Sequence, residues 1–293
     1  MVAVVAASGP PSEALLNSGL DFLKRKGFMT ITGRHLGKKT GYLAGTDAER
    51  VEDINEMLRN PLVRAVMLAR GGYGAMRILN SIDCEALLQD PKILLGMSDV
   101  TALQMSLYSR CGLVTLAGPF LAGQIGEGLD PLSEESLMRA LTEPIEGRDL
   151  FDGVANDLRL LKCGKASGPL LGGCLSLICA LMGTPHLPDL TGTILFLEDI
   201  QEPPYRIDRM LTQMKLAGVL DSVNAVVLGH FVGPDHDNLL PEVERILLEM
   251  TSDKRFPVVS GFPHGHKLPN ITIPSGVPAE LDTSVPSLTV RVG

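Results

Sequence analysis

A strand, a turn and a helix are encoded in succession by residues 92–110, KILLGMSDVTALQMSLYSR. Residues 92–96 are expected to form a strand, and the short apolar run at 93–95 within it is typical of a buried strand. A helix is expected from about residue 100 to residue 110. Between the two stands the tetrapeptide Gly96-Met97-Ser98-Asp99. This stretch therefore predicts a βα unit with a polar tip where the strand ends.

The same alternation occurs throughout the first half of the chain. The expected strands lie at 2–7, 63–69 and 113–117, and the expected helices lie at about 12–26 and from residue 46 to about residue 60. The second helix has a start signal, because Thr46 and Glu49 have the spacing of a capping box. Buried strands that alternate with amphipathic helices indicate βαβ units and a largely parallel sheet. We therefore predict an α/β domain over residues 1–150.

The second half of the chain begins after a stretch of different composition. Residues 120–157 are richer in glycine, proline and acids, with one expected helix near 133–142, and we interpret them as a connecting region. Strands are then expected at 157–162, 193–198 and 223–229, helices at 174–183 and 207–217, and short strands in a proline-rich tail at 271–273 and 287–292. We predict a second domain over residues 151–293.

Composition limits the location and the partners of the chain. A net charge of −8 without a Lys/Arg run argues against binding to nucleic acid or to an anionic membrane. The five cysteines include no CxxC pair, which is typical of a reduced, cytosolic protein. The first residues lack the basic start and the long apolar core of a signal peptide. We therefore expect a cytoplasmic location.

Ser98 is a candidate nucleophile. A serine between a strand and a helix projects its hydroxyl above the carboxyl edge of the sheet. The backbone N–H of Asp99 then points toward an oxyanion formed there, with help from the helix N-terminus. The Gly-x-Ser-x-Gly pattern is incomplete, since Val100 occupies its last position. From these residues alone, the simpler alternative that Ser98 is a helix N-cap is strong.

The loop Arg70-Gly71-Gly72-Tyr73-Gly74 follows the strand expected at 63–69. Adjacent glycines allow positive φ angles and a close approach of the backbone to a ligand. Their N–H groups could bind an oxyanion or a phosphate, and an ordinary tight turn is the alternative. The loop has neither the GxGxxG order of a dinucleotide site nor the Gly-Lys-Ser/Thr of a P-loop.

A base and a carboxylate are available in the second half. Glu198 ends the apolar strand at 193–198, where a buried carboxylate needs a partner, and Asp199 and Glu202 are close rivals. Two of the six histidines, His264 and His266, lie in a loop rich in glycine and proline, where functional residues are common. These residues alone do not choose among the candidates.

A metal centre is the less favoured chemistry. The segment Asp235-His236-Asp237 and the two histidines of the 263–270 loop offer ligands. There is no HExxH motif and no paired CxxC, and no His/carboxylate cluster has the spacing of a zinc site. We therefore expect no catalytic metal.

Five segments together resemble the LD-carboxypeptidase family of serine peptidases, which includes murein tetrapeptide LD-carboxypeptidases and microcin-immunity carboxypeptidases. In chain order they are ARGGYGAMRIL, GMSDVTAL, GGCLSLICALMGTP, LFLEDIQEPPYRIDRMLTQMKLAG and GHKLPNITIPSG. The resemblance extends over nearly the whole chain. It departs from the family's usual residues at Met97, where an aromatic residue is common, at Cys174, where asparagine is common, and at His264.

The resemblance implies a Ser-His-Glu triad. Ser98 would be the nucleophile, His266 the base and Glu198 the group that orients the imidazole. The backbone N–H groups of Gly72 and Asp99 would form the oxyanion hole. The family has an N-terminal α/β/α sandwich with a mostly parallel sheet, and a smaller C-terminal β-rich α/β domain. The resemblance also implies a homodimer with the active site between the domains, and no cofactor.

The implied reaction is hydrolysis of the amide between an L-centre and a terminal D-amino acid. A muropeptide tetrapeptide would lose D-alanine in this reaction during cell-wall recycling. One alternative is a microcin-immunity-type enzyme that cleaves a peptidyl- or aminoacyl-nucleotide. Such enzymes commonly stack an aromatic loop on the base, whereas this chain has no Trp and only four Tyr. A peptide-binding homologue without activity is a further alternative.

Overall fold

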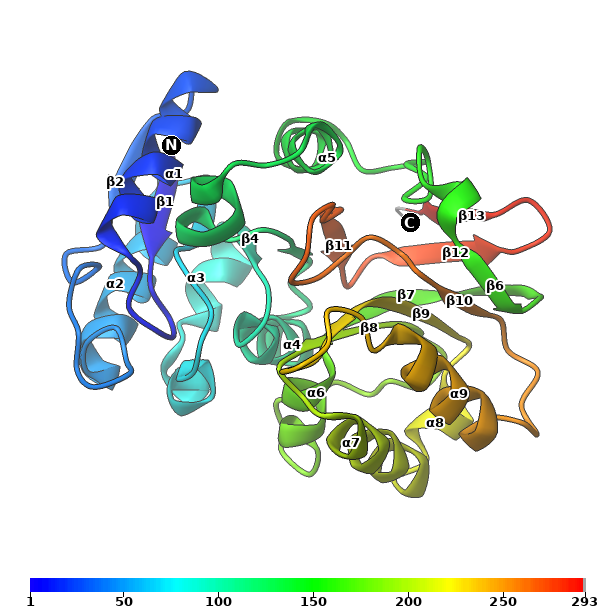
Figure 1. Ribbon diagram of the computed structural model, residues 1–293. Helices are drawn as coiled ribbons and strands as arrows, with labels where there is room; N and C mark the ends of the chain where they lie inside the picture. The colour runs from blue at the N-terminus through cyan, green and yellow to red at the C-terminus, as the bar shows by residue number, and fades with distance from the viewer. Residues whose placement is uncertain (292–293) are drawn as a thin grey trace.

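The first sheet is built from short strands, and each of them except β11 is followed by a helix or a helical turn, in the computed structural model, which describes residues 1–291 (Figure 1). The strand order is β11-β5-β4-β3-β1-β2. All neighbouring strands are parallel except β11 and β5. The strands are β1 (Val2–Val5), β2 (Thr30–Thr32), β3 (Ala65–Leu68), β4 (Ile93–Gly96), β5 (Thr115–Ala117) and β11 (Ile273–Ser275).

Helices cover both faces of this sheet because alternate strand residues point to opposite sides. Ala3 and Val5 of β1 share one apolar core with Ile54 of α2. Val2 and Val4 share another core with helix α1. This half is therefore the expected α/β/α sandwich. Its helices are α1 (Glu13–Arg25), α2 (Asp47–Arg59), α3 (Cys84–Gln89) and α4 (Val100–Cys111).

The second sheet is mixed and contains seven strands in the order β13-β12-β7-β8-β9-β10-β6. Its four central strands are parallel, and β6, β12 and β13 are antiparallel to their neighbours. The strands are β6 (Arg159–Lys162), β7 (Lys165–Cys174), β8 (Ile194–Ile200), β9 (Ala225–Val232), β10 (Val258–Ser260), β12 (Pro278–Asp282) and β13 (Ser287–Val290). The expected two-part α/β architecture is confirmed.

The helices of the second half gather on one side of this sheet (Figure 1). They are α6 (Leu175–Leu181), α7 (Pro204–Leu216), α8 (Val219–Ser222) and α9 (Leu240–Met250). The segment between the two sheets contains a π-helical turn, η2 (Leu121–Ile125), helix α5 (Pro131–Thr142) and a 3-10 turn, η3 (Ala155–Asp157). Within residues 1–291, every helix is too short or too polar to traverse a lipid bilayer.

The two sheets are joined by a shared apolar core, by a hydrogen bond and by a late segment of the chain that returns to the first sheet. A single apolar core contains Leu103 of α4, Ile178 of α6 and Leu228 of β9. The backbone N–H of Cys174 at the end of β7 donates to Thr101 Oγ1 of α4 at 3.1 Å. Strand β11 lies late in the chain but completes the first sheet. The boundary between domains 1–150 and 151–293 stays a prediction.

Several elements were not expected from the sequence, namely β2, α3, β7, β10, β12, α8, α9, the turns η2 and η3, and a 3-10 turn, η1 (Ala75–Ser81). The glycines of β7 prevented its prediction as a strand. They are required because β7 lies close to the backbone of its neighbours. A Cβ on Gly172 would lie 1.8 Å from the carbonyl oxygen of Phe196, and one on Gly168 would lie 1.9 Å from that of Gly192. Sequence patterns treat such glycines as loop signals, although here they allow β7 to lie close to its neighbours.

The start of α2 provides a test of the local signals. The Thr46 side chain accepts from the Glu49 N–H, and the Glu49 carboxylate accepts from the Thr46 N–H at 2.8 Å, so the expected capping box is confirmed. We expect Thr46→Ala to lower the free energy of unfolding by about 1 kcal/mol, because it removes one of these bonds. Urea unfolding measures the change.

The matched control is Ser12→Ala. Ser12 is the N-cap of α1 and makes no capping hydrogen bond with its side chain. We expect this variant to unfold at the same urea concentration as the unmodified protein. Equal shifts for the two variants would contradict a specific contribution from the capping box.

Candidate active site

Ser98 has a strained backbone. Strand β4 ends at Gly96 and α4 begins at Val100, and Ser98 lies between them with a φ of 56°. Among the described residues, only Gln201 shares a positive φ without being glycine. A Cβ on Gly96 would lie 2.8 Å from Val100 Cγ1, so this sharp turn requires glycine there. A serine held in this conformation between a strand and a helix has the geometry of a nucleophile elbow.

The glycine-rich loop lies directly against Ser98. A Cβ on Gly71 would come within 3.1 Å of the Ser98 Cβ and 2.7 Å of the Phe120 ring. Gly72 has a φ of 109°, which side chains rarely tolerate. The N–H of Gly9 donates to the Gly71 carbonyl at 3.0 Å and fixes the loop against the end of β1. The loop therefore brings bare backbone to the candidate nucleophile.

The side chain of Asp99 ties three segments together, a role that the sequence did not suggest. Its buried carboxylate accepts from Ser8 Oγ at 2.5 Å and from the Ala75 N–H at 2.8 Å. Burial raises the pKa of Asp99, and the hydrogen bonds from Ser8 and Ala75 oppose this effect. The turn that holds Ser98 is thereby fixed to the end of β1 and to the end of the glycine-rich loop.

Arg50 completes this network from helix α2. Its guanidinium is fully buried, donates to the carbonyl of Gly74 at 2.9 Å, and also donates to the carbonyl of Ala7 and to the Asp47 carboxylate. In the sequence it appears as one charged residue on an amphipathic helix, where an exposed position is the rule. No sequence signal distinguished it from the other arginines of the chain.

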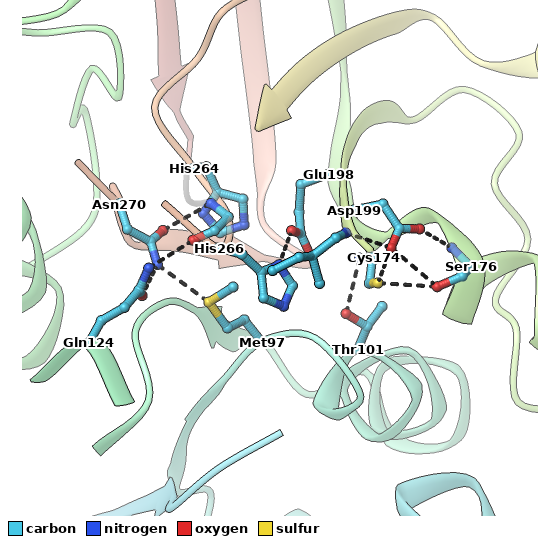
Figure 2. A network of polar contacts seen from close by, with 12 residues as sticks. Met97, Thr101, Gln124, Cys174, Ser176, Glu198, Asp199, His264, His266 and Asn270 are labelled. Carbon is cyan, nitrogen blue, oxygen red and sulfur yellow. Dashed lines mark hydrogen bonds and ion pairs between the residues drawn. The ribbon is translucent and has the colours of Figure 1, made fainter. Parts of the chain in front are cut away.

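Glu198 and His266 form a buried pair. His266 Nδ1 lies 2.6 Å from Glu198 Oε2, and Figure 2 shows the imidazole next to the carboxylate. Glu198 belongs to β8 and is 1% exposed. Gly265 allows the approach, because it has a φ of 123° and a Cβ there would lie 2.8 Å from Glu198 Oε2. Asn270 Oδ1 accepts from the Gly265 N–H at 3.2 Å and shapes the histidine loop.

The carboxylates near His266 favour the protonated form of its imidazole. Burial lowers the pKa of His266, but the charge and hydrogen bond of Glu198, together with the charge of Asp199, outweigh burial and raise it above the usual value. The second Glu198 oxygen, Oε1, is buried and has no hydrogen-bond partner among the described residues. The carboxylate is therefore directed to the imidazole.

The rival carboxylates have other contacts. Asp199 turns away from His266 and accepts from the N–H of Ser176 at 2.7 Å and from the Cys174 thiol at 3.3 Å (Figure 2). Burial and the charge of Glu198 raise the pKa of Asp199 to about 6. Glu202 forms an ion pair with Arg206 at 3.3 Å. Only Glu198 among the three contacts a histidine.

The rival histidines are also placed differently. His264 is 1% exposed, its Nδ1 lies 2.9 Å from the carbonyl oxygen of Ile271, and its ring packs edge-on against Phe196. Burial lowers the pKa of His264. Burial, followed by the charge of His264, lowers the pKa of His230 to about 4. Both histidines are therefore neutral near pH 7, and the carbonyl contact of His264 gives it a packing role.

Ser98 and His266 line one cleft of about 420 Å³, together with Arg70, Gly71, Gly72 and Phe120. Glu198 lies behind His266, and Asp99 follows Ser98 at the start of α4. The structure thus brings together all five residues expected from the sequence. No hydrogen bond joins the Ser98 and His266 side chains in this structure. Within residues 1–291, no group of three or more His, Cys, Asp and Glu side chains is placed to hold a metal ion.

A strained serine beside a histidine–carboxylate pair defines the class of serine hydrolases. The family model of the LD-carboxypeptidase N-terminal domain matches residues 2–118, and that of the C-terminal domain matches residues 167–281. The chain belongs to the LD-carboxypeptidase family and is a serine-type carboxypeptidase.

Individual relatives agree with this assignment. The chain is 41% identical to a putative carboxypeptidase of Streptomyces coelicolor, over 99% of this chain and 92% of the relative. It is 36% identical to a probable murein peptide carboxypeptidase of Bacillus subtilis, over 100% of this chain and 92% of the relative. The structure of the microcin C7 self-immunity protein superposes with a TM-score of 0.90 at 28% identity, and covers 100% of this chain and 96% of that one.

The electrostatics of the three histidines can be tested directly. In an NMR titration we expect His266 to have a pKa above the usual ~6.5, and His264 and His230 to have pKa values below it. Glu198→Gln should lower the pKa of His266, because it removes the negative charge that favours the imidazolium. A His266 pKa that is the same with and without the Glu198 charge would contradict the assigned cause.

Proposed function

We propose that this protein hydrolyses the L,D amide of a muropeptide tetrapeptide and releases the terminal D-alanine. In this proposal Ser98 is the nucleophile, His266 the general base and Glu198 the residue that orients the imidazole. The observation that carries the proposal is the 2.6 Å contact between His266 Nδ1 and Glu198. It occupies Nδ1 and leaves Nε2 to exchange a proton with Ser98 across the shared cleft.

The first half of the reaction forms an acyl-enzyme. Ser98 Oγ attacks the scissile carbonyl carbon while His266 Nε2 takes the hydroxyl proton. The N–H groups of Gly72 and Asp99 bind the oxyanion, and each such donor is typically worth about 3–4 kcal/mol. The carbon–nitrogen bond then breaks, and the imidazolium gives its proton to the departing amine of D-alanine.

The second half frees the enzyme. Water enters the cleft, gives a proton to His266 and attacks the ester carbonyl, and the proton then returns to Ser98 as the tripeptide leaves. Glu198 stabilises the imidazolium in both halves, which agrees with its effect on the pKa of His266. The missing Ser98–His266 hydrogen bond is compatible with these steps, because catalytic contacts often tighten only when substrate is bound.

Similarity to the probable murein peptide carboxypeptidase of Bacillus subtilis supports the choice of substrate. The proposal includes a cytoplasmic location, in keeping with five cysteines that form no disulfide. It also includes a homodimer, which the family resemblance implies.

A second candidate is hydrolysis of a peptidyl- or aminoacyl-nucleotide. It is favoured by the likeness to the microcin C7 self-immunity protein, one structure of which is a complex with aspartyl sulfamoyl adenosine. The absence of Trp from this chain weighs against it, because an aromatic loop commonly stacks on the base. Release of amino acid from such a nucleotide, with none from the tetrapeptide, would favour the second candidate.

The nucleophile and base can be tested by measuring D-alanine release from a muropeptide tetrapeptide. We expect Ser98→Ala and His266→Ala each to lower kcat by about 10⁴-fold or more, because members of a triad act as a unit. The matched control is His230→Ala, which removes a neutral histidine outside the cleft and should retain turnover. Substantial activity in folded His266→Ala, together with loss in His230→Ala, would place the base elsewhere.

The orienting carboxylate can be tested with Glu198→Gln and its control Glu202→Gln. We expect Glu198→Gln to slow release strongly, while Glu202→Gln stays close to the unmodified protein. A base must be neutral, so kcat/KM should fall on the acid side of the raised His266 pKa. In Glu198→Gln this limb should move to lower pH. A larger loss in Glu202→Gln would contradict the role of Glu198.

A further inference from the structure

A second cleft opens next to the catalytic one. It has a volume of about 810 Å³, and we call it the tyrosine cleft after its lining residues Lys39, Tyr42, Arg70 and Tyr73. Arg70 and Gly72 line both clefts, so the two adjoin at the glycine-rich loop. A substrate bound at Ser98 can therefore extend into the tyrosine cleft past the glycine-rich loop.

The two tyrosines are exposed where packing does not require them. Tyr42 is 65% exposed and Tyr73 is 52% exposed, and their rings meet edge-on with centroids 5.5 Å apart. Tyr42 lies on the loop before α2, and Tyr73 lies on the glycine-rich loop. Exposed aromatic rings that meet at a cleft offer a large apolar face together with polar hydroxyls, which is typical of a binding surface.

The cations of this cleft have no acidic partners. Lys39 makes no ion pair or side-chain hydrogen bond among residues 1–291, and Arg70 donates only to the carbonyl oxygen of Pro10 at 3.0 Å. The neighbouring Lys38, in contrast, pairs with Glu49 at 2.5 Å. In a chain with a net charge of −8, two unpaired cations at one cleft favour an anionic ligand.

We infer that the tyrosine cleft is a subsite for the part of the substrate N-terminal to the scissile bond, and that Lys39 recognises a carboxylate there. The released residue is small if it is D-alanine, so only the longer acyl part can use a cleft of about 810 Å³. This inference rests on the proposed function, and it specifies the substrate as a peptide with a free carboxylate before the bond that is cleaved.

The test compares two tetrapeptides that differ in one group. Both carry γ-linked D-glutamate as the second residue, with its α-carboxylate either free or converted to the amide. We expect Lys39→Ala to raise KM for the free acid by roughly three- to tenfold, as for loss of one exposed charge-assisted contact, and to leave kcat unchanged. For the amide, Lys39→Ala should leave both KM and kcat unchanged. The effect should also shrink as salt is added.

Two controls separate charge from general damage. Lys38→Ala removes the adjacent lysine, which does not line the cleft, and it should leave KM unchanged for both peptides. Tyr42→Ala should raise KM for both peptides alike, because it removes an apolar face rather than a charge. An equal loss for acid and amide in Lys39→Ala, or no loss for either, would overturn the inference.

Binding gives a readout that does not depend on turnover. Calorimetry with Ser98→Ala should show tighter binding of the free acid than of the amide, and Lys39→Ala added to this variant should abolish the difference. If the unmodified protein releases no D-alanine but this difference is present, the proposed function fails and the subsite stands. Equal binding of the two peptides, or no binding of either, would refute the subsite.

Discussion

The contact between His266 and Glu198 is the interaction on which the site depends, because it holds the imidazole against a buried carboxylate of the second sheet. A carboxylate that is 1% exposed is costly to bury without a charged or hydrogen-bonded partner. Glu198 is fixed by β8 in the second sheet, whereas the loop with His266 leads into β11, which pairs with β5 in the first sheet. His266 is thereby held where the two sheets meet, and it lines the same cleft as Ser98.

Ser98 lies on the other side of the cleft from His266 and has a strained backbone. Surrounding contacts must offset the free-energy cost of this strain. A non-glycine residue at positive φ costs on the order of 1–3 kcal/mol, and Ser98 has a φ of 56°. The Asp99 carboxylate fixes the same turn through Ser8 and Ala75, and Arg50 holds the adjacent Gly74 carbonyl. These buried contacts come from the scaffold rather than from a ligand, so Ser98 and the backbone around it are positioned before any substrate binds.

Local sequence signals predicted the first sheet well and the supporting contacts poorly. The strands around Ser98 and the capping box at Thr46 were predictable, because burial periodicity and cap chemistry act within a few residues. The glycines of β7 resemble those of a loop in the sequence. They are required because the neighbouring backbone lies too close for a side chain. The choice of Glu198 over its neighbours came from family resemblance, since contact with a histidine 68 positions away leaves no local trace. Arg50 was missed for the same reason.

The central claim is that Ser98 is a nucleophile activated by the histidine–carboxylate pair. Its most direct test is covalent labelling with a fluorophosphonate, located by mass spectrometry of the digested protein. The account predicts one adduct, on Ser98, whose formation is greatly slowed in His266→Ala. An unlabelled protein, an adduct on another serine, or equal labelling with and without His266 would contradict it.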